Sequence, residues 1–374
     1  MVFIGGPRQV GKTTLALTFL ANKLSLKKTN LAGLEEHEAY LTWDKRELRK
    51  KILNNELPEH HGIIIFDEIH KFRKWRNLLK GIYDTRKHSL QIIVTGSAKL
   101  DYYRRGGDSL LGRYHHYRLH PLSLPELAQF ETNRRKTLEL LMHFSGFPEP
   151  FFRQDETYLR RWRLERRKKL ALEDLRDLEQ VREISLIELL IELLPSRVGS
   201  PLSIQNLAQD LESTHPTVKN WIEIMDRLYI SFRISPFGFP KIRAVKKEQK
   251  LYLWDWSEIE DQGSRFENLV ASHLIKFCHF VEDTQGFLMD LRYLRDTDGR
   301  EIDFVVLKNK KPLFAVECKL GDTKRSKNLK YFKERTTIPK FYQVHMSQSS
   351  DYGDATIGGR ILPFEKFCEI ENLV

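Results

Sequence analysis

A glycine-rich loop between an apolar run and a helical run constrains this chain more than any other feature of its sequence. The loop, GPRQVGKT from Gly6 to Thr13, matches the phosphate-loop pattern G-x-x-x-x-G-K-[ST] at every fixed position. Residues 2–5 before it are strand-like and residues 14–20 after it are helical, which is the context that the pattern requires. A chance glycine-rich turn is the alternative, and this context argues against it.

The residue types of the loop suit ATP and Mg²⁺. Glycines let backbone N–H groups surround phosphates, and the N-terminus of the following helix adds a favourable dipole. We expect Lys12 to reach the β- and γ-phosphates and the Thr13 hydroxyl to ligate Mg²⁺. The expected nucleotide-binding residues are Gly6, Pro7, Arg8, Gln9, Val10, Gly11, Lys12, Thr13 and Thr14.

An acidic pair follows a second apolar run, in IIIFDE at residues 63–68. A buried strand there would bring Asp67 to the magnesium ion and place Glu68 to polarise the attacking water. A further strand-like run ends in TGS at residues 95–97, which makes Ser97 a candidate for positioning that water.

Arg113, in the motif SLLGR, is the candidate for stabilising charge on the γ-phosphoryl group, because a guanidinium can bind its oxygens bidentately. A surface arginine in a basic segment is the alternative. The sequence leaves open whether Arg113 acts within its own subunit or on a neighbour in a homo-oligomer.

The order of apolar runs predicts the architecture. Strand-like runs at residues 2–5, 40–43, 62–66 and 90–95 alternate with helical stretches, which is typical of a three-layer α/β sheet with mostly parallel strands. The predicted domains are an ATPase core at 1–120, a helical lid or connector at 121–200, a winged helix-turn-helix at 201–249, and a mixed α/β domain at 250–374. We read residues 195–201, PSRVGSP, as a linker.

Composition excludes two classes of protein. The most apolar stretch, residues 184–194, is interrupted by Glu188 and Glu192, so no run approaches the roughly 20 residues that span a bilayer. No signal peptide fits the start, and we expect a cytoplasmic protein without a membrane partner. The three cysteines are far apart in sequence, which predicts neither a disulfide framework nor a zinc site.

A net charge of +11 is compatible with a polyanionic partner, and we expect DNA. The predicted helix-turn-helix offers His215, Thr217, Lys219 and Asn220 to a DNA groove. The basic run RRWRLERRKK at residues 160–169 would contact phosphates. The alternatives are packing of the helix-turn-helix against neighbouring domains and an ordinary solvated helix face.

Two strand-like runs near the C-terminus form a predicted hairpin about a turn at residues 308–311. Asp303 would lie nearly opposite Glu317, and strand alternation puts Lys319 on the face of Glu317. Two carboxylates and a lysine are the arrangement of PD-(D/E)xK nucleases, in which the acids bind Mg²⁺ and the lysine orients water. Glu267 resembles the helical acid that completes such a metal site.

Taken together, these motifs resemble one known group. GPRQVGKTT, DE-I-H, TGS, SLLGR and HPLSLPEL, followed by GFPEPF, RFENLV and the Asp…Glu-x-Lys pattern, are similar to prokaryotic AAA-type P-loop ATPases with a C-terminal domain of unknown function. The resemblance implies an ATPase core, a helical lid, a winged helix and a restriction-endonuclease-like domain. Two departures stand out: the sequence starts directly on its first predicted strand, so the leader segment usual before it is missing or was left out, and Ser145 stands where a glycine is common before GFPE.

The sequence therefore predicts an ATP-hydrolysing enzyme that acts on DNA through a nuclease-like domain. Two alternatives stay open. One is a nucleotide-driven switch or assembly protein whose nuclease-like domain only binds, and the other is an ATPase that acts on a protein partner.

Overall fold

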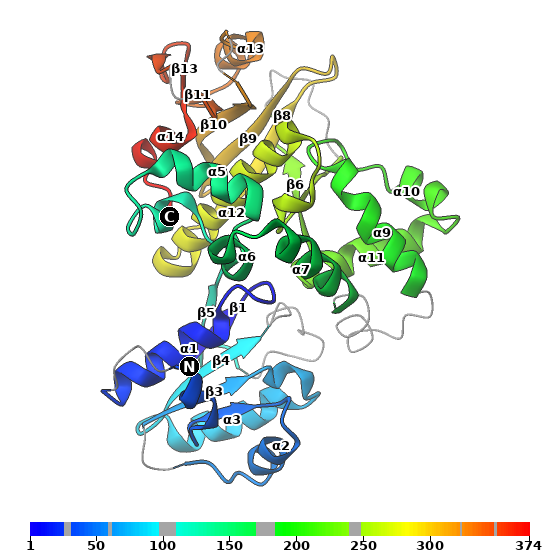
Figure 1. Cartoon of the computed structure of the whole chain (residues 1–374). Helices are drawn as coiled ribbons and strands as arrows, with labels where there is room; N and C mark the ends of the chain where they lie inside the picture. Colours follow the sequence, from blue (N-terminus) through cyan, green and yellow to red (C-terminus); the bar gives the residue numbers. More distant parts are fainter. Residues whose placement is uncertain are drawn as a thin grey trace. The chain divides into compact units, whose positions relative to one another are not determined.

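The computed structural model describes residues 1–25, 31–58, 62–96, 110–169, 184–238, 248–321, 324–347 and 350–374. The chain divides into two compact units, which Figure 1 shows with the sequence running from blue to red. The first comprises Met1–His120 with Arg227–Tyr229, and the second comprises Pro121–Asp226 with Ile230–Val374. No helix in the described part of the chain is both long enough and apolar enough to cross a membrane.

The first unit is built on a five-stranded sheet in the order β2-β3-β4-β1-β5, with every neighbouring pair parallel. The strands are β1 (Val2–Gly5), β2 (Tyr40–Thr42), β3 (Ile63–Asp67), β4 (Gln91–Gly96) and β5 (His115–Arg118). The four predicted strands are confirmed within one or two residues. The sequence does not predict β5, because HHYR has no apolar alternation and is ordered by its pairing with β1.

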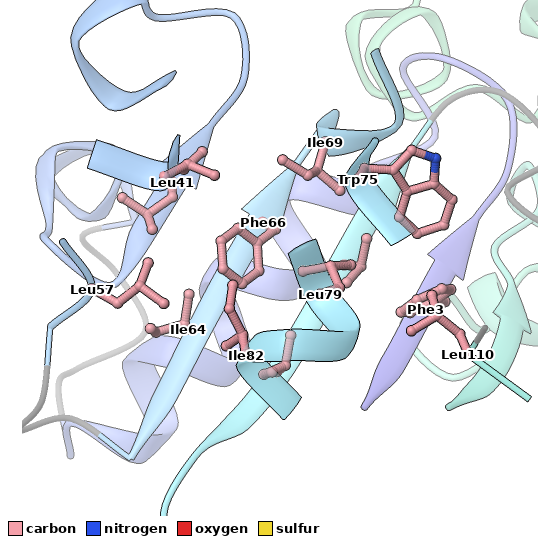
Figure 2. Packing of buried hydrophobic residues seen from close by; sticks show 13 residues of the cluster. Phe3, Leu41, Leu57, Ile64, Phe66, Ile69, Trp75, Leu79, Ile82 and Leu110 are labelled. Carbon is pink, nitrogen blue, oxygen red and sulfur yellow. The ribbon is translucent and has the colours of Figure 1, made fainter. Parts of the chain in front are cut away.

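Helices cover both faces of this sheet, so the predicted three-layer arrangement is confirmed. In β3, Ile64 and Phe66 pack into a cluster with α3 (Trp75–Arg86), which Figure 2 shows at close range. Ile63 and Ile65 point to the opposite face and pack with α1 (Lys12–Lys23), since successive side chains of a strand alternate. The short helices are η1 (Ala32–Glu36), α2 (Arg46–Leu53) and η2 (Ile69–Lys71).

The second unit contains an eight-stranded mixed sheet in the order β12-β13-β11-β10-β9-β8-β6-β7. Its strands are β6 (Ser231–Pro236), β7 (Lys250–Leu253), β8 (Met289–Arg295), β9 (Glu301–Lys308), β10 (Lys311–Lys319), β11 (Phe341–His345), β12 (Tyr352–Asp354) and β13 (Gly359–Pro363). Its helices are α4 (Leu124–Leu127), α5 (Arg134–Phe144), α6 (Pro148–Arg153), α7 (Glu156–Lys169), α9 (Ile184–Leu193), η4 (Leu194–Arg197), α10 (Ile204–Asp210), α11 (His215–Arg227), η5 (Trp256–Glu258), α12 (Gln262–Gln285), α13 (Lys327–Arg335) and α14 (Phe364–Ile370).

The predicted linker at residues 195–201 is wrong. This segment forms η4 and then docks on β7, where the Gly199 N–H donates to the carbonyl oxygen of Leu251 at 3.4 Å. Leu202 donates to Gln249 at 2.8 Å in the same way. The edge backbone of β7 thereby gains partners, which the Pro- and Gly-rich sequence alone does not reveal. The predicted lid, helix-turn-helix and C-terminal domain consequently share one compact unit.

The basic run on α7 only partly faces solvent. Arg166 is 5% exposed, and its guanidinium carbon lies 4.2 Å from the centre of the Phe147 ring. It pairs with Asp255 at 3.5 Å, and the neighbouring Arg167 pairs with Glu258 at 2.7 Å. The prediction that the whole basic run contacts phosphates is therefore wrong for Arg166. Helical periodicity turns it inward, where two acids of a distant segment neutralise it.

Ser145 ends α5 in a strained conformation. Its φ is 73° and its ψ is 173°, a region that is nearly restricted to glycine. The side chain is fully buried, and its Oγ has no hydrogen-bond partner among the described residues. At the next position, Gly146, any other residue would clash, since a Cβ atom there would lie 2.5 Å from Trp256.

We predict that Ser145→Gly stabilises the second unit, because it relieves backbone strain of about 1 kcal/mol. Chemical denaturation followed by tryptophan fluorescence measures the change. Ser145→Ala is the control, since it removes the hydroxyl and keeps the strain. The account is wrong if the glycine variant is no more stable than the alanine variant.

Candidate functional site

The phosphate loop leaves the carboxyl end of β1 and leads into α1, and its shape depends on two glycines. A Cβ atom at Gly6 would lie 2.2 Å from the carbonyl oxygen of Leu119, which follows β5. Gly11 has a φ of 94° at the N-cap of α1, in the left-handed region that favours glycine. Gly6 is therefore required because the backbone of Leu119 comes so close, and Gly11 because its φ is positive.

Lys12 lies inside the loop. Its Nζ donates to the carbonyl oxygens of Gly6 at 3.1 Å and Pro7 at 2.6 Å, and the residue is only 6% exposed. The ammonium is thus held at the centre of the backbone segment that the sequence assigns to phosphates. A fixed cation surrounded by backbone amides is suited to a polyphosphate.

Asp67, at the end of β3, receives three hydroxyl groups. Thr13 Oγ donates to Asp67 Oδ2 at 3.1 Å, Tyr40 Oη donates to the same oxygen at 2.6 Å, and Thr95 Oγ donates to Oδ1. The structure therefore brings together Thr13 and Asp67, the two predicted Mg²⁺ ligands of this unit. This grouping of a hydroxyl and a carboxylate beside the phosphate loop fits Mg²⁺ coordination.

Sequence reasoning missed Tyr40 and Thr95. Burial, together with the charge of Asp67, raises the pKa of Tyr40 above its ordinary value, so its hydroxyl remains a donor. Thr95 belongs to the TGS motif, but the sequence directs attention to Ser97, which lies outside the described residues. The signal for Thr95 is its position at the carboxyl end of β4, directly beside Asp67 in the register.

Glu68 adopts a left-handed conformation with a φ of 55°, which turns its side chain away from the line of β3. Its carboxylate lies 3.6 Å from His70 Nε2 and 3.9 Å from Lys71 Nζ. Burial lowers the pKa of His70, so the imidazole is neutral at pH 7. The histidine of the motif DE-I-H thus places a neutral ring beside Glu68, the predicted base.

Arg113 lies at the wrong edge of the sheet for a role in its own subunit. It donates to Asp84 of α3 from Nε at 2.8 Å and from Nη2 at 3.2 Å. β5 begins beside Val2, and the Met1 amino group donates to the carbonyl oxygen of Arg113 at 3.0 Å. Arg113 is therefore at the amino edge of the parallel sheet, whereas the phosphate loop leaves the carboxyl edge. Only contact with a neighbouring subunit remains open for its predicted role.

We predict that Thr95→Val lowers the rate of ATP turnover by about tenfold to a hundredfold while nucleotide affinity changes little. A buried carboxylate oxygen that loses its only described donor is destabilised by about 1–3 kcal/mol, and its orientation is released. Steady-state turnover and fluorescent-nucleotide binding separate the two effects. Thr85→Val is the control, since that hydroxyl bonds only backbone carbonyls within α3. Equal turnover in both variants would contradict the role of Thr95.

A second cluster lies on the β9–β10 hairpin. Phe304 pairs with Val316, so the next positions, Asp303 and Glu317, are opposite each other and share a face. Asp303 Oδ2 accepts from the Cys318 N–H at 2.7 Å, and Lys319 Nζ lies 2.8 Å from Glu317 Oε1. The structure therefore brings together three of the four residues of the predicted nuclease-like site.

Glu317 has one oxygen to spare. Its Oε2 is buried and has no hydrogen-bond partner among the described residues. Burial, and then the charge of Asp303, raises the pKa of Glu317 to about 8. Two adjacent carboxylates with an unsatisfied oxygen fit a divalent cation, because such an ion would relieve both the repulsion and the missing contact.

Glu267 of α12 has other partners. It accepts from Tyr252 Oη at 2.8 Å and lies 3.4 Å from Lys250 Nζ. Among the described residues, no three His, Cys, Asp or Glu side chains are placed to hold one metal ion. The predicted metal set of Glu267, Asp303 and Glu317 is therefore not formed, because an ammonium occupies the position next to Glu267. The sequence gives no direct signal for Lys250, since β7 comes from a distant part of the chain.

Three family profiles match successive parts of this chain. Residues 1–128 match the family profile of an AAA domain. Residues 135–257 and 262–366 match two domains of unknown function, DUF8612 and DUF4143. The AAA match covers the part of the chain that contains the phosphate loop, and the geometry of that loop agrees with the similarity.

Two uncharacterised proteins of Methanocaldococcus jannaschii are similar along most of the chain. MJ1637 is 25% identical over 91% of this chain and 79% of its own length. MJ1544 is 24% identical over 76% of this chain and 67% of its own length. Among solved structures, the Orc1 protein of Aeropyrum pernix in complex with DNA covers 72% of this chain and 86% of its own. Its TM-score is 0.31 at 15% identity.

Proposed function

We propose that this chain is a Mg²⁺-dependent ATPase that uses ATP hydrolysis to drive an operation on DNA, with a nuclease-like second unit. The observation that carries the ATPase part is the contact between Thr13 and Asp67, at 3.1 Å, behind a phosphate loop that holds Lys12 at its centre. The hydroxyl and the ammonium come from the end of the phosphate loop, the carboxylate comes from the end of β3, and the three groups meet at one edge of the sheet.

In the proposed reaction, the loop amides and Lys12 bind the phosphates, while Thr13 and Asp67 hold the ion. Mg²⁺ held there would neutralise phosphate charge and polarise the γ-phosphoryl group. Tyr40 and Thr95 keep the Asp67 carboxylate oriented through their hydroxyls. Glu68 accepts the proton of the attacking water. Ser97 as a water-positioning residue and Arg113 acting on a neighbouring subunit complete the proposal.

We predict that Lys12→Ala abolishes ATP turnover and weakens nucleotide binding, because it removes the cation that the loop encloses. Glu68→Gln, which keeps the shape and loses the base, should bind ATP and fail to hydrolyse it. Phosphate release and equilibrium nucleotide binding are the measurements. Near-normal turnover in a folded Lys12→Ala protein would end the ATPase proposal.

The arrangement of the second unit supports contact with DNA. Helices α9, α10 and α11 are followed by the antiparallel pair β6–β7, and Pro201 forms a bridge with Lys250. This order of helices and strands supports the proposed winged helix. His215, Lys219 and Asn220 are exposed on the first turns of α11, where a recognition helix reads a groove.

We predict that Lys219→Glu weakens binding to duplex DNA of any sequence, because the lysine would contact phosphates. The slope of log K against log salt should fall by about 0.9 for each lost phosphate contact. Lys50→Glu is the matched control, because Lys50 is equally exposed on α2 of the other unit. If both variants bind alike at every salt concentration, or if the wild type binds no DNA, action on a protein partner becomes the better proposal.

The order α12-β8-β9-β10-α13-β11 supports the nuclease-like part of the proposal, since it supplies a helix, a three-stranded meander and a further strand parallel to β10. Asp303 and Glu317 would hold one divalent ion, which supplies activation of water and of the phosphodiester. Lys319 would orient that water. Nicking of plasmid DNA with Mg²⁺ or Mn²⁺ tests this part: Asp303→Ala should abolish it and leave ATP turnover intact.

A nucleotide-driven switch with a catalytically inactive module is the second candidate. The observation that favours it is the ammonium of Lys250 among the acids of the cluster. Absence of any cleavage by a wild type that hydrolyses ATP and binds DNA would select this candidate.

A further inference from the structure

A lysine with no exposed surface lies inside the acid cluster of the second unit. Lys250 begins β7, and its Nζ lies 3.4 Å from Glu267 Oε1 and 3.9 Å from Asp303 Oδ1, with Glu301 as its third carboxylate partner. A buried ammonium is tolerated only where anions compensate it, and here three carboxylates from α12 and β9 surround one cation. Lys250 therefore provides positive charge where acids converge.

The surroundings of Lys250 hold it in place. Its backbone pairs with Ile234 of β6 and forms the bridge to Pro201. The ammonium lies 5.4 Å from the centre of the Tyr293 ring, which adds a cation–π contact. Tyr252, two residues further on the same face of the strand, donates to Glu267 at 2.8 Å. The side chain is thus fixed by its strand, by an aromatic ring and by its ion pairs.

The backbone closes the cluster on the side of Glu267. A Cβ atom at Gly199 would lie 3.1 Å from both carboxylate oxygens of Glu267, so the chain passes directly over that carboxylate. Glu267 consequently has Lys250, Tyr252 and the backbone at Gly199 as close neighbours, and its side chain is 18% exposed.

The acids and the cations of this cluster nearly balance in number. Its four acids are Glu267, Glu301, Asp303 and Glu317, and its three cations are Lys250, Lys319 and Arg295, which pairs with Glu301 at 3.1 Å. With every group ionised, four negative and three positive charges leave a net charge of −1. The unsatisfied oxygen belongs to Glu317, whose other oxygen lies 2.8 Å from Lys319 Nζ. The unsatisfied Glu317 oxygen beside Asp303 thus leaves a place for one cation.

We propose that Lys250 is a built-in cation that takes the place of a second metal ion: the cluster binds one divalent cation at Asp303 and Glu317, and Glu267 is held by Lys250 instead of by metal. This inference rests on the proposed metal site of the hairpin and adds its stoichiometry and its ligand set. Lys250 is a positioning residue, since it acts on the metal through the carboxylates that it fixes.

Binding of Mn²⁺ to the full chain without nucleotide tests the proposal by titration calorimetry. Only binding that Asp303→Asn removes is counted. The wild type should bind one ion, and Glu267→Gln should keep that stoichiometry with an affinity within about threefold. Lys250→Met removes a positive charge a few ångströms from the site, so it should tighten binding by about tenfold or more, or admit a second ion.

Lys276→Met is the matched control. Lys276 is also a buried lysine of this unit, but its Nζ donates to the carbonyl oxygen of Pro121 at 3.0 Å and pairs with Glu126, outside the cluster. Its removal should leave Mn²⁺ binding unchanged. Thermal unfolding of both variants checks the fold. If Lys250→Met does not fold, Glu267→Gln decides, because loss of Mn²⁺ in that variant would make Glu267 a metal ligand.

Three results would overturn the proposal: two ions bound by the wild type, loss of binding in Glu267→Gln, or a Lys250→Met protein that binds like Lys276→Met. If Lys250→Met binds Mn²⁺ like Lys276→Met and the binding still depends on Asp303, the proposed metal site is retained and only the role of Lys250 is rejected. Absence of Mn²⁺ from both the wild type and Lys250→Met would end the metal site as well. ATP turnover in the same preparations tests the first unit independently.

Discussion

The position of β1 between β4 and β5 is the constraint on which the nucleotide site depends. Gly5 lies beside Gly96 in the parallel register, and Thr95 lies beside Asp67, so three carboxyl ends reach the same edge of the sheet. The loop after β1 can then meet the acid after β3 across the end of β4. Helices pack on both faces of the sheet, and Figure 2 shows the buried cluster around Phe66 on one of them.

The second unit depends on a hairpin instead. Asn309 and Lys310 both have positive φ, at 51° and 65°, as a two-residue turn between right-twisted strands requires. That turn pairs Lys308 with Lys311, and a bulge between Pro312 and Phe314 then shifts the register by one residue, which brings Asp303 opposite Glu317. The remaining cation, Lys250, comes from a strand that pairs with β6, directly after the helix-turn-helix. A movement of the β6–β7 pair would therefore move the lysine relative to the acids of β9.

Buried cations change the meaning of the net charge. Of the +11 in the sequence, Arg166, Lys250 and Lys276 are each less than 10% exposed and face carboxylates inside the second unit. These residues stabilise packing between segments that are distant in sequence, and they offer nothing to a polyanion. The exposed His215, Lys219 and Asn220 are better placed for that purpose.

The sequence by itself determined the elements and the residues whose chemistry is local. The phosphate loop, the strands of both sheets that alternate or are strongly apolar, and the position of Asp303 nearly opposite Glu317 follow from motif spacing and strand periodicity, which act over a few residues; the bulge that completes this pairing does not. Tertiary structure alone decided which distant groups meet. Tyr40 and Thr95 reach Asp67, Lys250 reaches Glu267, Arg166 turns inward, and Arg113 lies at the amino edge of its sheet. Each of these depends on strand order or on packing between segments tens of residues apart, and no local pattern carries that information.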